Sequence, residues 1–500
     1  MQKVEKQIQT GESVKVLRLW EMIFLGKGSI PRQIIHAVIS ISLRLFFRRI
    51  ESSGVEKVPQ DGGIIFVLNH QNGLVDPALV YVSLIRRISF LAKSTLFSIP
   101  IAGWLLRTLE VLPLYRQVDA GDMAKNLRTF EICRELLNRD RCIAMFPEGI
   151  SHNETKLQPI KTGAARIALG ALGVGREGEI LESASTKSNK FQTVAEQNPK
   201  SQIPNPKLKV MAVGLYYTSK TAFRSEALIR YGEIFEVEKV ELDESGEPPR
   251  EAVKILTDKI ENALRNVTLN LESQRELDAI LKAEALFSSV YKNLLFKQTL
   301  TQTFQRLQGL AKKYELLEKN DPQKMRQLNE KIIAYEGELK TSGLTHESLS
   351  VLQHPTFYVF RYLILRIFIL SILSPLAIIG AIIHSPAYLF SNFIGLAFKS
   401  HGADAVGSTY KILAAMAFMP LTWLIVGLII FWVFGWQIAL ISIPITILCG
   451  YIALRSSETL IDLSIWIKSV WLLFRQRGLF LRLLLQREIL QKEIGEIVKE

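Results

Sequence analysis

The sequence has 500 residues, of which 48% are hydrophobic, and its formal net charge is +13 at pH 7. This length accommodates two or three domains, and the positive charge is typical of proteins that bind nucleic acid or an anionic membrane surface. Paired Cys/His ligands and basic runs with interleaved aromatic residues are missing from the sequence, which argues against nucleic acid. The cysteines, Cys133, Cys142 and Cys449, are neither clustered nor at metal-ligand spacing, which argues against a disulfide framework or a zinc site and indicates a reducing compartment.

The N-terminal region predicts a helix at a membrane interface. The opening stretch MQKVEKQIQTGESVK is polar and lacks the apolar core of a secretory signal. Residues 34–49 are apolar but short, and His36 and Arg44 interrupt them. We therefore expect them to lie on the membrane surface rather than to cross it.

Short apolar runs alternating with helical patterns predict an α/β domain. The helical patterns lie at 77–86 and 121–138. The strand-like runs lie at 62–69, 88–92, 109–115, 141–146, 208–217 and 227–235. This alternation favours a largely parallel sheet flanked by helices.

The middle of the chain predicts an insertion and then a helical region. Residues 175–207 are rich in Ser, Asn, Gln, Lys and Glu, and we expect a disordered surface insertion there. The prolines at 248–249 begin a helix that continues to about Val267. Residues 272–349 are charged and periodic, and Asn-Asp-Pro at 320–322 divides them into two long helices, which predicts a helical hairpin.

Two uncharged stretches near the C-terminus predict membrane-spanning helices. Residues 367–398 and 412–454 contain no Lys, Arg, Asp or Glu, whereas one crossing needs about 20 apolar residues. The second stretch predicts two spans joined by a turn at Gly435. The first contains Pro375 and Pro386, so we expect one span plus an interfacial or re-entrant segment, and three crossings in all. A buried hairpin in a large soluble core is the alternative, but such helices rarely continue so long without a charge.

Residues 463–486 predict a basic helix on a lipid surface, because their only charges are Lys and Arg among Trp, Leu and Phe. The sequence thus divides into N-terminal interfacial helices (1–50), an α/β domain (51–270), a helical hairpin (271–350), a transmembrane region (351–460) and a basic amphipathic C-terminal helix (461–500).

Polar residues follow two of the predicted strands. The stretch IIFVLNHQNGLVDP brings His70 to the carboxyl edge of the sheet, where open α/β folds place their ligand sites. Asp76 precedes Pro77 and a helical pattern, so it is either an N-cap or a partner of His70. A second strand ends in FPEGISH, and Glu148 and His152 need solvent or a substrate beside them. We expect both clusters to face one crevice.

Basic residues near these strand ends favour an anionic ligand. Arg116 follows the strand-like run VLPLY, and Lys161 begins a helix of small residues. Both types of side chain bind phosphate, although a solvated surface charge is the alternative for either one alone.

Four motif blocks resemble those of the phospholipid and glycerol acyltransferase superfamily, and they occur in the family's order between residues 50 and 240. The blocks are NHQNGLVDP, VLPLYR, FPEGISH and LKVMAVGLYY. The spacing between His70 and Asp76 is one residue longer than usual, and the third block departs from the common Thr-Arg-Ser continuation after FPEG. Both departures resemble the fungal-type glycerol-3-phosphate acyltransferase branch, as does FRSEALIRYGEI at 223–234.

The resemblance implies roles for particular residues. His70 is implied as a general base and Asp76 as the carboxylate that orients it. The implied substrate-binding residues are Arg116, Phe146, Pro147, Glu148, Gly149, Ser151, Lys161 and Arg224. Arg116 would hold the phosphate, with Lys161 or Arg224, and Glu148 would contact a glycerol hydroxyl.

The implied reaction is transfer of a fatty acyl group from acyl-CoA or acyl carrier protein to glycerol-3-phosphate or 1-acylglycerol-3-phosphate in phospholipid biosynthesis. No metal and no further cofactor are expected. The implied protein is integral to a membrane, contacts membrane lipids and has its catalytic domain on the cytoplasmic side. Remodelling of another lysophospholipid, a catalytically silent lipid-binding scaffold and a metal-dependent hydrolase are the alternatives, and the last lacks a complete ligand set.

Overall fold

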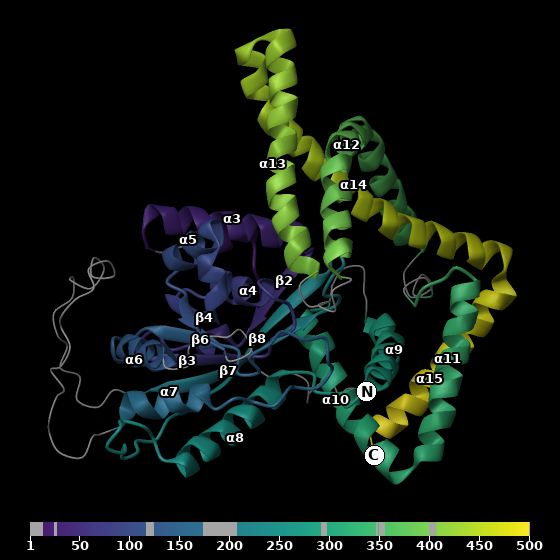
Figure 1. Ribbon diagram of the computed structural model, residues 1–500. Coiled ribbons are helices and arrows are strands. Elements are labelled where there is room, and N and C mark those ends of the chain that lie inside the picture. Colours follow the sequence, from purple (N-terminus) through teal and green to yellow (C-terminus); the bar gives the residue numbers. More distant parts are fainter. Residues whose placement is uncertain are drawn as a thin grey trace.

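The structure is a computed structural model that describes residues 14–24, 28–116, 125–173, 208–291, 298–346, 349, 356–399 and 407–499 (Figure 1). Its strands are β1 (Val14–Val16), β2 (Arg49–Ser53), β3 (Ile64–Leu68), β4 (Ile88–Lys93), β5 (Leu112–Leu114), β6 (Cys142–Met145), β7 (Lys209–Tyr217) and β8 (Glu226–Glu236). Its main helices are α2 (Leu19–Phe24), α3 (Ile30–Phe46), α4 (Val75–Ser83), α5 (Pro100–Thr108), α6 (Lys125–Asn138), α7 (Gly163–Leu172), α8 (Arg250–Val267), α9 (Gln274–Tyr291), α10 (Leu300–Asn320), α11 (Pro322–Thr341), α12 (Thr356–Lys399), α13 (Gly407–Phe434), α14 (Trp436–Arg475) and α15 (Arg477–Lys499). The insertion expected at 175–207 lies outside the described residues.

The described strands form one eight-stranded, largely parallel sheet, as predicted. Their order is β1-β2-β8-β7-β3-β6-β4-β5. Strands β7, β3, β6, β4 and β5 pair in parallel, whereas β8 is antiparallel to β7 and β1 is antiparallel to β2. The carboxyl ends of β3 and β6 therefore meet at the same edge of the sheet.

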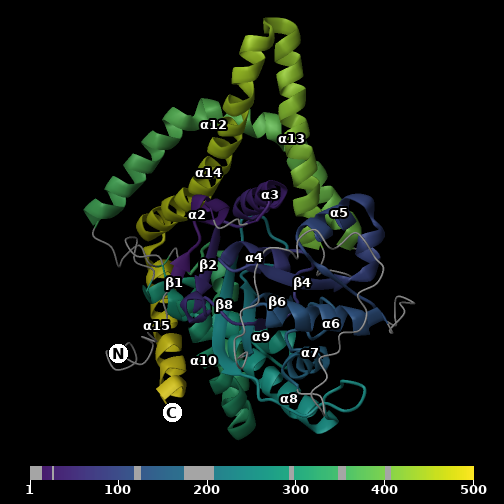
Figure 2. The same cartoon turned by 90° about the vertical axis from the view of Figure 1, so that its left-hand side faces the viewer.

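Helices cover both faces of the sheet, which explains the uninterrupted apolar run of β3. Successive side chains of a strand point to opposite faces. Ile64, Phe66 and Leu68 pack with α2, α3 and α4, whereas Ile65 and Val67 pack with α6, α7 and α8. Figures 1 and 2 show these two helical layers on either side of the strands.

Helices α9, α10, α11 and α15 form a helical unit beside β2 and β8. Phe304 of α10 packs on Leu228 of β8, and Phe480 of α15 is buried with apolar residues of α9 and α11. The structure thus has three helices in the described part of 272–349, where the sequence predicts two, although the break at Asp321 is where we expected it.

The predicted basic surface helix also needs correction. Residues 463–475 continue α14, and α15 begins at Arg477 and packs against α9 and α11. Arg487 is only 1% exposed in this helix. Phe480 and Leu483 of α15 pack on protein, whereas Leu481 and Leu485 remain exposed.

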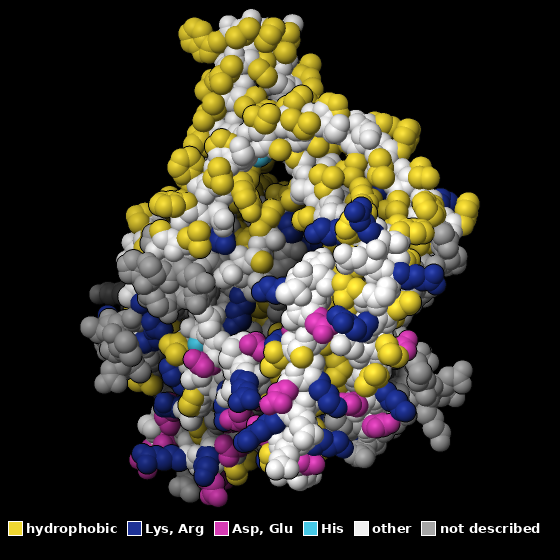
Figure 3. Space-filling view, turned by 90° about the vertical axis from the view of Figure 1, so that its right-hand side faces the viewer, with side chains coloured by type: hydrophobic (Ala, Val, Ile, Leu, Met, Phe, Trp, Pro, Cys, Tyr) yellow, Lys and Arg dark blue, Asp and Glu magenta, His cyan; other side chains and the backbone are white. Residues whose placement is uncertain are grey.

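Within the described residues, three helices are long and apolar enough to cross a membrane: α12, α13 and α14. At most 22% of the residues in their most apolar windows are buried, so their side chains need a lipid environment. Figure 3 shows hydrophobic side chains gathered over these helices and charged side chains over the lower part of the molecule. The predicted turn at Gly435 separates α13 from α14.

Helix α12 is one continuous helix where the sequence predicts a span plus a separate segment. It contains Pro375 and Pro386, which bend helices, and it is arched in Figure 2. Its first turns pack on Leu463 of α14. Towards its other end, Tyr388 packs edge-on to Phe223 of the β7–β8 loop, with 5.7 Å between the ring centroids.

Candidate active site

The ends of β3 and β6 bring the two predicted polar clusters together. β3 and β6 pair in parallel, with Val67 opposite Met145. The chain beyond β3 is fixed by Asn69, whose side-chain amide donates to the carbonyl oxygen of Leu215 at 3.1 Å and accepts from the Leu215 N–H at 2.7 Å. This side chain continues the ladder to β7 and so sets the position of His70.

His70 and Asp76 form a hydrogen-bonded pair. His70 Nδ1 lies 2.9 Å from Asp76 Oδ2, and the imidazole is partly exposed whereas the carboxylate is fully buried. A carboxylate only accepts hydrogen bonds, so Nδ1 carries the proton and Nε2 is left as the basic nitrogen. The additional residue in the loop between them does not separate the pair.

Asp76 is held by four hydrogen-bond donors, and it is not the N-cap of α4. Its Oδ2 accepts the backbone N–H groups of Gln71 and Asn72, both at 2.7 Å, in addition to the imidazole. Helix α4 begins at Val75, and Leu74 is its N-cap. The carboxylate faces back into the loop that follows His70 and fixes that loop around the ring.

Tyr217 is a functional residue that the sequence analysis did not single out. Its hydroxyl donates to Asp76 Oδ1 at 2.5 Å. Burial, together with the charge of Asp76, raises the pKa of Tyr217, so the phenol stays protonated. The tyrosine ends the block LKVMAVGLYY, but only the three-dimensional arrangement reveals its partner.

Glu148 supports the same loop from the other strand. Its Oε1 accepts the backbone N–H of His70 at 2.7 Å, and its Oε2 accepts the Gln158 N–H at 2.8 Å and lies 2.5 Å from His152 Nε2. The His152 N–H donates in turn to the His70 carbonyl at 3.1 Å. Glu148 therefore positions the backbone of His70.

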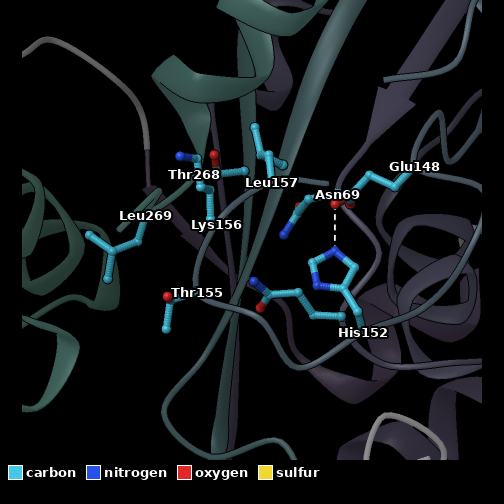
Figure 4. A pocket seen from close by; sticks show the side chains of 9 residues that line it. Asn69, Glu148, His152, Thr155, Lys156, Leu157, Thr268 and Leu269 are labelled. Atoms are coloured by element: carbon cyan, nitrogen blue, oxygen red, sulfur yellow. Dashed lines mark hydrogen bonds and ion pairs between the residues drawn. The ribbon is translucent and has the colours of Figure 1, made fainter. Parts of the chain in front are cut away.

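A small pocket opens beside Glu148 (Figure 4). Figure 4 shows the ion pair between Glu148 and His152 at one side of this pocket. The lining residues are Asn69, Gln71, Glu148, His152, Thr155, Lys156, Leu157, Thr268 and Leu269. Residues that follow β3 and β6 thus line one recess, although His70 itself is not among its lining residues.

Phe146 packs directly on the imidazole. The rings of Phe146 and His70 are stacked, with centroids 4.0 Å apart and an interplanar angle of 21°. Pro147 is buried, and its carbonyl oxygen accepts the N–H of Lys161 at 2.9 Å. The apolar ring limits the orientations of the imidazole on the face that it covers.

Two basic side chains meet at Gly149. Arg116 donates from Nη1 to the Gly149 carbonyl oxygen at 3.1 Å. Lys161 Nζ lies 2.3 Å from the place where a Cβ at residue 149 would be, and the backbone φ there is +74°. The positive φ favours glycine at this position, and the flexible Lys161 side chain lies over it. Ser151 follows, half-buried.

Arg224 has structural contacts instead. Its Nε lies 2.5 Å from Glu458 Oε1 of α14, and its Nη1 donates to the carbonyl oxygens of Arg44, Leu45 and Phe47 at the end of α3. We therefore leave Arg224 out of the proposed phosphate site. In the described ranges, no group of three or more His, Cys, Asp or Glu could hold a metal ion.

The part of the sheet that carries the histidine–carboxylate pair matches a known protein family. Residues 49–180 match the family described as Acyltransferase. Residues 285–500 match the family described as Glycerol-3-phosphate acyltransferase 2 C-terminal domain. Both the sheet domain and most of the C-terminal helices are therefore similar to acyltransferase families.

Curated relatives agree with these matches. Glycerol-3-phosphate O-acyltransferase 1 of Saccharomyces cerevisiae is 25% identical, over 77% of this chain and 58% of its own length. Glycerol-3-phosphate O-acyltransferase 2 of the same yeast is 26% identical, over 63% of this chain and 39% of its own length. A chloroplastic 1-acyl-sn-glycerol-3-phosphate acyltransferase of Brassica napus is 32% identical, over 26% of this chain and 36% of its own length. The chain thus spans 58% or less of the length of each of these relatives.

Among solved structures, the 1-acyl-sn-glycerophosphate acyltransferase of Thermotoga maritima is similar over 50% of this chain and 86% of that chain. Its sequence identity is 16% and its TM-score is 0.30, so no detail of the site is taken from it.

Proposed function

We propose that the chain transfers a fatty acyl group from an acyl thioester to a hydroxyl of glycerol-3-phosphate or 1-acylglycerol-3-phosphate at a membrane. The observation that carries this proposal is the 2.9 Å contact between His70 Nδ1 and Asp76 Oδ2. The relatives bear the names of acyltransferases for these two acceptors, which supports the choice of substrates. The donor is acyl-CoA or acyl carrier protein.

The histidine acts as a general base in this reaction. His70 Nε2 takes the proton of the acceptor hydroxyl as the oxygen attacks the thioester carbonyl carbon. Asp76 fixes the tautomer and stabilises the imidazolium that forms. The C–S bond then breaks, and the imidazolium returns its proton to the leaving thiolate. The acceptor hydroxyl is the nucleophile, so the enzyme needs no serine.

Arg116 and Lys161 bind the acceptor phosphate in this proposal. Both cations lie at Gly149, which directly follows the glutamate that supports His70. A phosphate held there places the glycerol part of the acceptor towards the imidazole. Arginine suits this role because its planar guanidinium forms paired hydrogen bonds with phosphate oxygens.

We expect Arg116→Ala to raise KM for the acceptor about ten-fold to 100-fold, because a charge-assisted hydrogen bond to phosphate is lost. Arg116→Lys should restore part of the affinity. Initial rates at varied acceptor concentration measure the effect. Arg128→Ala is the matched control, since Arg128 is 72% exposed on α6 and pairs with Glu131. An unchanged KM for Arg116→Ala would remove Arg116 from the phosphate site.

The membrane places the acyl chain next to this site. Helices α2, α3 and α5 expose apolar side chains that include Trp20, Ile34 and Trp104, in addition to the apolar helices α12–α14. Figure 1 shows α3 and α5 on the same side of the sheet as α13. A donor or acceptor acyl chain can thus remain in lipid during the reaction. Arginines beside these helices, such as Arg44 and Arg48, favour the cytoplasmic side for the catalytic domain.

The deciding experiment uses membranes that contain the full chain and a labelled acyl donor. Glycerol-3-phosphate, 1-acylglycerol-3-phosphate and other lysophospholipids are supplied one at a time, with membranes from cells without the chain as background. Product above this background with one of the first two acceptors supports the proposal. Product only with another lysophospholipid indicates remodelling, and lipid binding without turnover indicates a scaffold.

A further inference from the structure

The first turns of the membrane helix α13 lie against the loop that connects His70 to Asp76. The backbone N–H of Leu74, in this loop, donates to the hydroxyl oxygen of Thr409 at 3.1 Å. Thr409 belongs to α13 and is 6% exposed. Figures 1 and 2 both show the lower end of α13 next to α4, which begins at this loop.

A second loop at the same edge is also attached to α13. Lys411 Nζ donates to the carbonyl oxygen of Thr221 at 3.2 Å, in the loop between β7 and β8. The stem of Lys411 passes directly over Gly395 of α12, where a Cβ would lie 2.3 Å from Lys411 Cγ. Ile412 packs on the core formed by α3, α4 and the sheet. The start of α13 is therefore fixed at the catalytic domain over several residues.

These two loops are joined to each other. The side-chain amide of Asn72 donates to the carbonyl oxygen of Lys220 at 3.2 Å, and Asn72 is fully buried. The Asn72 N–H also donates to Asp76 Oδ2. The contacts thus run without a gap from α13 through both loops to the carboxylate that holds the imidazole.

We propose that Thr409 is a positioning residue of the active site, through which a membrane helix holds the His70–Asp76 loop in its reactive geometry. This inference rests on the proposed acyl transfer. The Leu74 N–H lies at the N-cap of α4, and the Thr409 hydroxyl oxygen accepts its hydrogen bond. Loss of this acceptor allows residues 71–75 to shift, and the distance from His70 to Asp76 changes with them.

The test compares Thr409→Val with Thr409→Ser in the full chain. Valine keeps the shape and removes the acceptor, whereas serine retains the hydroxyl. We expect kcat of Thr409→Val to fall about ten-fold with KM for the acceptor unchanged, and kcat of Thr409→Ser to stay within about two-fold of the parent. Thr422→Val is the matched control in the same helix, since the Thr422 hydroxyl donates only to its own helix, at Phe418 O. It should keep the parent kcat.

A second variant covers the case in which Thr409→Val does not fold. Lys411→Met retains the stem beside Gly395 and removes the bond to the Thr221 carbonyl, so we expect kcat to fall about three-fold without a change in KM. The inference is overturned if the foldable variants keep the parent kcat, or if Thr409→Ser loses as much as Thr409→Val, which would indicate a packing role.

Hydrogen exchange separates this inference from the proposed function. In the parent the amide of Leu74 should exchange slowly, and in Thr409→Val it should exchange at least about ten-fold faster, whether or not any acceptor is turned over. If the parent chain shows no acyl transfer, the proposed function is contradicted. Faster exchange of the Leu74 amide in Thr409→Val would still support the contact in that case. Equal exchange rates with normal turnover would contradict the contact alone.

Discussion

His70→Ala is expected to lower kcat about 1,000-fold while the chain remains folded and in the membrane. The substitution removes the nitrogen that accepts the hydroxyl proton, and general-base catalysis contributes roughly 100-fold to 10,000-fold. The backbone N–H of His70 still donates to Glu148, so the loop keeps this support. Acyl transfer to the preferred acceptor measures the loss.

The control for this prediction is His346→Ala, because His346 lies after α11 and its ring packs beside Tyr335 in the helical unit. It should keep the parent kcat. If His70→Ala retains more than about a tenth of the activity, another group removes the proton and the proposed mechanism is wrong.

Asp76→Asn is expected to lower kcat by a similar factor for a different reason. Every group around the carboxylate donates a hydrogen bond: the imidazole, two backbone N–H groups and the Tyr217 hydroxyl. The amide oxygen can remain at the three-donor position, and the Tyr217 hydroxyl can rotate to accept from the amide nitrogen. The fold is thus retained, with a loss of about 1–3 kcal/mol for the weakened contacts. The negative charge that stabilises the imidazolium is lost.

The measurements are kcat and the free energy of unfolding of the same preparation. Asp258→Asn, on the exposed face of α8, is the matched control for both. Tyr217→Phe should give a smaller loss of kcat, since it removes one of the four donors and leaves the charge. A normal kcat for Asp76→Asn would show that the carboxylate serves the fold and not the reaction.

The sequence predicts the parts of this site that depend on local pattern. The apolar runs that become β3 and β6 are continuous because both faces of the sheet are covered, and polar residues follow directly where each strand ends. His70, Asp76 and Glu148 are therefore recognisable in the sequence. The short strands β1 and β2 are not, because β1 is largely exposed and β2 has the polar sequence RIESS.

The contacts that complete the site come from distant parts of the chain. Tyr217 lies 141 positions beyond Asp76, and Thr409 lies 335 positions beyond Leu74. No local periodicity encodes such pairs, because a tyrosine at a strand end or a threonine at a helix start does not by itself indicate a contact with a distant residue. Arg224 shows the reverse case. Its motif suggests a phosphate ligand, and its backbone and side chain instead join α3 to α14.

The arched course of α12 also determines which parts of the chain its two ends contact. Its first turns pack on Leu463 of α14, and the neighbouring Asp462 pairs with Arg48 of the catalytic domain. Its last turns lie against Lys411, whose ammonium group donates to the Thr221 carbonyl of the same domain. Both ends of α12 therefore lie on the side of the catalytic domain. The α13–α14 hairpin also returns to its side of origin, because α15 packs on α9 and α11. The catalytic domain, the helical unit and α15 are thus packed on one another and lie on one side of the apolar helices.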